Sequence, residues 1–92
     1  MKAFHILSSR RVQGVGFRAF AARTAKENHL TGFVKNKSDG SVEMVIQGDD
    51  KLLSKCLEEV KARFKDHIDD IKLSAMASAK KFEDFQIIAN YL

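Results

Sequence analysis

The chain has 92 residues, 45% of them hydrophobic, and a net charge of +4 from 16 Lys and Arg against 12 Asp and Glu. This length fits one small two-layer domain over residues 1–92, and no apolar run approaches the ~20 residues that cross a bilayer. A single cysteine excludes an internal disulfide framework, no secretory signal pattern opens the chain, and we expect a cytoplasmic monomer whose basic balance suits an anionic ligand.

The first elements in chain order are a strand, a loop and a helix. Residues 2–9 alternate in the manner of a strand. Gly14 and Gly16 break that pattern and predict a loop. Apolar residues at helical spacing then predict a helix over about residues 17–29.

A hairpin and a second helix follow. Residues 31–37 predict a second strand, and the Asp39-Gly40 pair is a strong hairpin signal before a third strand that ends at Gly48. Asp49 and the acid after it supply a conventional helix start. The second helix carries its apolar residues at helical spacing: Leu53, Cys56, Leu57, Val60 and Phe64.

Two short alternating segments complete the order. Residues 71–75 predict a fourth strand and residues 85–87 a short last strand, with a turn at 80–81 between them. The resulting β-α-β-β-α-β order, with one short extra piece, predicts an α+β, ferredoxin-like fold. In that fold two helices cover one face of an antiparallel sheet.

The start of the first helix lacks the usual capping residues. Between residues 10 and 23 there is no Ser, Thr, Asp or Asn, and Arg18 stands in the first turn, where the helix macrodipole favours an acid. Two glycines, bare amides and a guanidinium indicate a site for an anion such as phosphate. A glycine-capped, water-solvated helix end beside an ordinary surface Arg is the alternative, and the local residues leave both open.

The sequence shows no metal site and no obvious nucleophile. His5, His29 and His67 have no metal-ligand spacing, and Cys56 lies on the apolar face of the second helix, where we expect it in the core. The glycines, free amides and Arg18 before and within the first helix would form a cradle for an anion. Without a nucleophile or a metal, such a cradle can position a phosphoryl group and stabilise developing charge. That equipment suffices for an acyl phosphate, because its carboxylate leaves without protonation.

Asn36 is the candidate for holding the attacking water. It lies at the end of the second predicted strand, and its amide can accept from water through oxygen and donate to phosphate through nitrogen. Asn in this position is also a common turn former. The residues alone therefore leave a catalytic and a structural interpretation.

Two segments together resemble the acylphosphatase family. Residues 12–18 read V-Q-G-V-G-F-R and resemble the family's signature V-Q-G-V-x-F-R. Residues 32–43 contain G-F-V-K-N followed by D-G-S-V-E and resemble its second signature, and weaker similarity extends along most of the chain. The resemblance implies the ferredoxin-like fold and a hydrolase that cleaves small acyl phosphates to carboxylate and inorganic phosphate, without metal or cofactor.

The resemblance also implies roles for individual residues. Arg18 matches the family's catalytic Arg, which would bind the phosphoryl oxygens, and Asn36 matches the Asn that orients the attacking water. The substrate-binding backbone amides correspond to Gln13, Gly14, Val15, Gly16 and Phe17. Phosphate and sulfate are expected to compete for this cradle. The chain departs from the family pattern in having Arg10 where Gly is usual and Phe33 where Trp is common.

Two other functions stand as alternatives. RNA-recognition modules share the β-α-β-β-α-β order, but their aromatic octamer must lie on a central strand. Here Phe17 and Phe20 open a predicted helix, so we expect no nucleic-acid partner. A non-catalytic domain that binds phosphate or a carbamoyl phosphate-like ligand is the second alternative, against which Arg18 and Asn36 favour a working hydrolase.

Overall fold

The computed structural model describes residues 2–8, 16–65, 71–77 and 81–88. Its elements, in chain order, are β1 (Lys2–Ser8), α1 (Phe17–Glu27), β2 (Thr31–Asn36), β3 (Val42–Gly48), α2 (Asp50–Phe64), β4 (Ile71–Ala77) and β5 (Phe85–Ile88). The predicted β-α-β-β-α-β order with a short final strand is confirmed. Neither described helix is long and apolar enough to span a membrane.

The strands form one sheet in the order β4-β1-β3-β2-β5. The first three pairings in this order are antiparallel, as predicted, whereas β5 pairs in parallel with β2. This parallel edge was not predicted, and it follows from the path of the chain. β4 ends at the end of the sheet where β2 begins, so a strand that crosses to the far edge there must run in the direction of β2.

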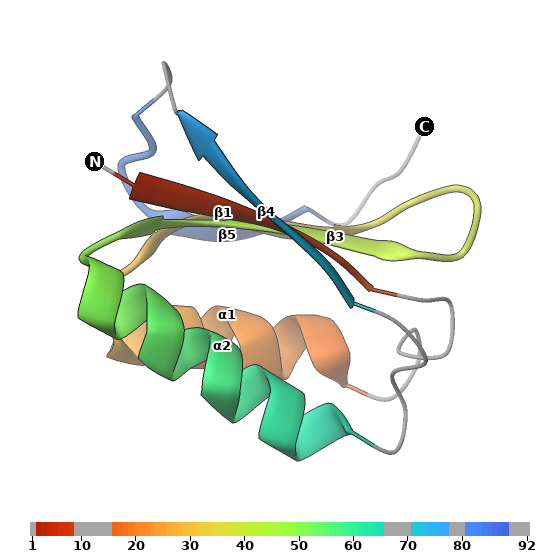
Figure 1. Cartoon of the computed structure of the whole chain (residues 1–92). Coiled ribbons are helices and arrows are strands. Elements are labelled where there is room, and N and C mark those ends of the chain that lie inside the picture. The colour runs from red at the N-terminus through yellow and green to blue at the C-terminus, as the bar shows by residue number, and fades with distance from the viewer. Residues whose placement is uncertain (1, 9–15, 66–70, 78–80, 89–92) are drawn as a thin grey trace.

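Both helices cover the same face of the sheet (Figure 1), as predicted. Alternate residues of β3 are buried on that face, and the apolar stripe of each helix packs onto them because burial of that stripe removes apolar surface from water. The central members of this core have exposed fractions of 1% or less: Ile6, Ala21, Ala25, Val34, Val42, Met44, Ile46, Leu53, Cys56 and Val60.

Aromatic contacts fix the beginning of α1 against the end of α2. The ring centroids of Phe17 and Phe64 are 5.1 Å apart, and those of Phe20 and Phe64 are 5.4 Å apart with the rings nearly perpendicular. Tilted and edge-to-face pairs of this kind are favoured arrangements of aromatic rings. The start of α1 is therefore held in place by packing.

Two elements, α1 and β2, were predicted to extend further than they do. α1 ends at Glu27, two residues before the predicted end, because His29 adopts φ +58° and the side chain of Asn28 turns back to donate to the carbonyl of Thr24 at 2.8 Å. β2 ends at Asn36, because the amide of Lys37 already belongs to the turn and donates to the carbonyl of Ser41 at 2.7 Å. The predicted hairpin itself is confirmed.

Candidate active site

The strands β1, β2 and β5 end at the same end of the sheet, where α1 begins. Ser8 at the end of β1 lies opposite Val42, which in turn lies opposite Asn36 at the end of β2. Ile88 at the end of β5 lies beside Lys35 in the parallel pairing. α1 begins at this same end, because its chain leaves from the end of β1 and returns along the sheet (Figure 1).

The first turn of α1 has no side-chain cap in the described part of the chain. Gly16 precedes the helix with φ +80° and ψ +16°, and the first turn holds no acidic residue. The predicted uncapped start is therefore confirmed. Of the predicted cradle, Gly16 and Phe17 are described, whereas Gln13, Gly14 and Val15 lie outside the described residues, as does Arg10. The side chain of Phe17 is buried in the core, so only its backbone could serve a ligand.

Arg18 is half-buried and reaches from the start of α1 to the end of β5. Its Nη1 donates to the carbonyl oxygen of Ile88 over 3.5 Å, at the outer limit of a hydrogen bond. Ile88 lies beside Lys35, the residue before Asn36, so this contact directs the guanidinium toward the end of β2. The ion pairs found among the described side chains do not involve Arg18.

Asn36 has an unsatisfied acceptor. Its Oδ1 is buried, and among the described residues it has no hydrogen-bond partner. Asn36 alternates with the fully buried Val34 along β2, so its side chain lies on the sheet face that the helices cover. Leaving a buried acceptor unpaired costs about 1–3 kcal/mol, which indicates an atom held ready for water or a ligand.

The opposite face of the sheet carries a cluster that the sequence did not reveal. Nε2 of His5 lies 2.6 Å from Oε2 of Glu43, and Nζ of Lys35 lies 3.6 Å from Oε1 of the same carboxylate. The alternation of polar residues at 5, 35 and 43 was the available signal, but only the strand register shows that they meet. Through the cluster, Lys35, the residue before Asn36, is joined to Glu43 of β3.

The other singled-out residues are structural. Cys56 is completely buried, and burial, with the nearby Glu59 carboxylate, raises the pKa of its thiol to about 12. It is a core residue, as predicted, and at neutral pH it carries no nucleophilic thiolate. His29 follows α1 in a left-handed conformation, two residues beyond the helix end, and His67 lies outside the described residues. Within the described ranges no three His, Cys, Asp or Glu side chains are placed to hold a metal ion.

Comparison with known proteins decides the family. The family model named acylphosphatase matches residues 4–87. The chain belongs to the acylphosphatase family. An acylphosphatase of Geobacillus kaustophilus is 47% identical over 62 residues, and this match spans 67% of the chain and 66% of the relative. An acylphosphatase of Lactobacillus gasseri is 38% identical over 79 residues, spanning 84% of the chain and 87% of the relative.

Acylphosphatases also share the three-dimensional structure. The crystal structure of acylphosphatase from Bacillus subtilis matches with a TM-score of 0.85 at 33% identity, covering 96% of this chain and 99% of that chain. The two signatures thus predicted the family and the fold correctly, and acyl phosphate hydrolysis is the activity that goes with this family. The RNA-recognition alternative loses its structural basis, because Phe17 and Phe20 lie on α1 and contact Phe64.

Proposed function

We propose that this protein hydrolyses the carboxyl–phosphate bond of small acyl phosphates to carboxylate and inorganic phosphate. The observation that carries the proposal is the buried Oδ1 of Asn36, which has no hydrogen-bond partner among the described residues and lies at the same end of the sheet as the start of α1. Oδ1 of Asn36 provides a hydrogen-bond acceptor for water, and the start of α1 provides backbone amides and a guanidinium that can bind an anion.

In the proposed mechanism the phosphoryl oxygens are bound by the backbone amides of residues 13–17 and by the guanidinium of Arg18. These donors stabilise the charge that develops on the equatorial oxygens. Phe17 and Arg18 need no reorganisation for this, because the contacts of Phe17 and Phe20 with Phe64 fix the start of α1. Arg18 adds a planar fork of donors that matches phosphate oxygens.

The attacking water is held by Asn36. Oδ1 accepts a hydrogen bond from the water, so that a lone pair of the water oxygen is directed at phosphorus. As the new P–O bond forms, the bond to the acyl oxygen breaks and the carboxylate leaves with that electron pair. The proton of the water is released to phosphate or solvent. The leaving group needs no general acid, and the chemistry we propose uses no metal or cofactor.

The test is the hydrolysis of benzoyl phosphate, followed spectrophotometrically, in the parent protein and in Arg18→Ala and Asn36→Ala. We expect kcat/KM to fall by about 100- to 1000-fold in each variant, the usual effect of removing a preorganised donor or a positioning group. Lys55→Ala, which removes a cation from the exposed face of α2, is the control and should retain activity.

A stability measurement distinguishes a functional loss from a folding defect. Because Oδ1 of Asn36 is buried and has no hydrogen-bond partner in the described part of the chain, Asn36→Ala should be no less stable than the parent while losing turnover. Parent protein that binds phosphate but leaves benzoyl phosphate intact would instead support the non-catalytic phosphate-binding alternative. A monomeric state and a cytoplasmic location stay predictions of the sequence.

A further inference from the structure

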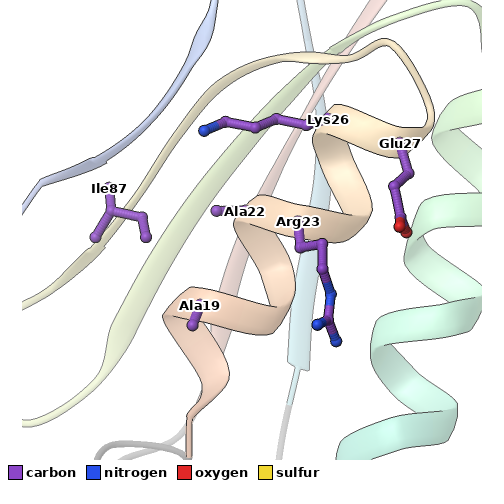
Figure 2. A pocket seen from close by; sticks show the side chains of 6 residues that line it. All are labelled: Ala19, Ala22, Arg23, Lys26, Glu27 and Ile87. Atoms are coloured by element: carbon purple, nitrogen blue, oxygen red, sulfur yellow. The ribbon is translucent and has the colours of Figure 1, made fainter.

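An open groove runs between α1 and β5, outside the residues assigned to the phosphoryl group (Figure 2). Its volume is about 510 Å³, which lies within the roughly 300–1,000 Å³ of small-molecule sites. The groove is lined by Ala19, Ala22, Arg23, Lys26, Glu27 and Ile87.

The floor of the groove is apolar. Ala22 is 4% exposed, and Ile87 is 46% exposed, the one exposed large hydrophobic side chain among the described residues. Ile87 pairs with Val34 in the register of β5 and β2, so it lies on the helix-covered face, at the edge of the sheet. An apolar ligand group covering Ile87 would remove this surface from water.

The groove continues from the proposed phosphoryl site. Arg18 lies four residues before Ala22, on the same side of α1, and its guanidinium contacts the carbonyl of Ile88, the neighbour of Ile87. From Arg18 to Lys26 the helix rises about 12 Å, at 1.5 Å per residue. A phosphoryl group bound at Arg18 would therefore leave its acyl chain at the mouth of the groove.

Three charged side chains of α1 line the groove: Arg23, Lys26 and Glu27. Figure 2 shows the side chain of Lys26 extending from α1 toward β5, whereas Arg23 and Glu27 point to the side of α2. Arg23 is engaged with the ring of Phe20, 5.7 Å from its centroid. Lys26 thus supplies the charge that a ligand in the groove would meet.

We propose that this groove binds the acyl part of the substrate and selects acyl phosphates with a short apolar chain that ends in a second anionic group. The inference rests on the proposed function. Ala22 and Ile87 would contact the methylenes, and Lys26 would pair with the distal carboxylate of a dicarboxylic acid monophosphate. The ligand and the groove would match in length, in apolar surface and in the positions of their charges, along one line that starts at Arg18.

The experiment compares kcat/KM for three substrates: acetyl phosphate, pentanoyl phosphate and the monophosphate of glutaric acid. The last two have the same number of carbons, and only the glutaryl compound carries a distal carboxylate. In Lys26→Met we expect the glutaryl-to-pentanoyl ratio to fall about two- to fivefold, the size of an exposed ion pair. In Ile87→Ser the pentanoyl-to-acetyl ratio should fall about threefold, because one apolar contact surface is lost.

Lys61→Met, on the exposed face of α2, makes the same change of charge away from the groove and should leave both ratios as in the parent. Equal ratios in the parent, Lys26→Met and Ile87→Ser would overturn the groove assignment while hydrolysis of acetyl phosphate still upheld the proposed function. Parent protein that hydrolyses none of the three substrates would overturn the proposed function itself. Thermal melts of each variant separate changes of selectivity from changes of folding.

Discussion

The two helices of this protein begin in opposite ways. At the start of α2 the Asp49 carboxylate accepts from the amides of Lys51 at 3.0 Å and Leu52 at 3.4 Å, and Asp50 adds a second acid in the first turn. α1 begins after Gly16 without a side-chain cap in the described residues and with Arg18 in its first turn. The same free amides and the same positive dipole end are neutralised in one helix and left available in the other.

The difference separates stability from function within one small fold. A capping carboxylate at α1 would satisfy the amides, but it would also occupy the position proposed for the phosphoryl group and repel that group. The protein instead holds α1 by packing, through the contacts of Phe17 and Phe20 with Phe64. Packing replaces capping where the helix end is proposed to bind substrate.

Among the changes that compare the two helix starts, we expect the largest effect from giving α1 the kind of start that α2 has. Gly16→Asp places a carboxylate beside the cradle, and an added Cβ would meet no described atom within 4 Å. We expect kcat/KM for benzoyl phosphate to fall about 100-fold, because the new charge competes with the phosphoryl group at the amides. The free energy of unfolding should change by less than about 1 kcal/mol, since the favourable charge–dipole interaction offsets the left-handed φ that Asp tolerates.

Gly16→Asn is the control for shape without charge. It should retain more activity than Gly16→Asp, because Asn accepts the same φ and brings no negative charge. Equal losses in the two variants would show that the backbone geometry at this position matters and that the charge does not.

A smaller effect is expected from an anion that fills the open helix end. Inorganic phosphate at ten times its dissociation constant should stabilise the protein by about 1.4 kcal/mol, which raises Tm by roughly 5–10 °C for a domain of this size. Differential scanning fluorimetry measures the shift, with ionic strength held constant by chloride. The shift should disappear in Arg18→Ala and persist in Asp49→Ala, because Asp49 caps the other helix and its removal leaves the open start of α1 unchanged.

The smallest effect is expected from removing the cap of α2. Asp49→Ala should lower the free energy of unfolding by about 1 kcal/mol and Tm by about 4–8 °C, because the two amides it accepts from lose their partner. Denaturant unfolding measures the loss. Turnover of benzoyl phosphate at 25 °C should remain that of the parent, and a large loss of turnover here would contradict the division of roles between the two helix starts.

Local signals in the sequence were sufficient for most elements. The Asp39-Gly40 turn, the acids at the start of α2 and the apolar spacing of Leu53 to Phe64 each act over a few residues, and the structure confirms them. The end of α1 was predicted two residues too late, because no strong sequence signal indicates that His29 adopts a left-handed conformation.

The sequence by itself determined the order of strands and helices, the missing cap at α1 and the two signatures that identified the family, because each depends on neighbours along the chain. Only the tertiary structure decided that β5 pairs in parallel with β2, and hence that Arg18 reaches Ile88 and the groove opens beside Ile87. The contact between Arg18 and Ile88 joins residues 70 positions apart. Their register is set by the path of the whole chain and by packing of the core, which no local pattern of residues encodes.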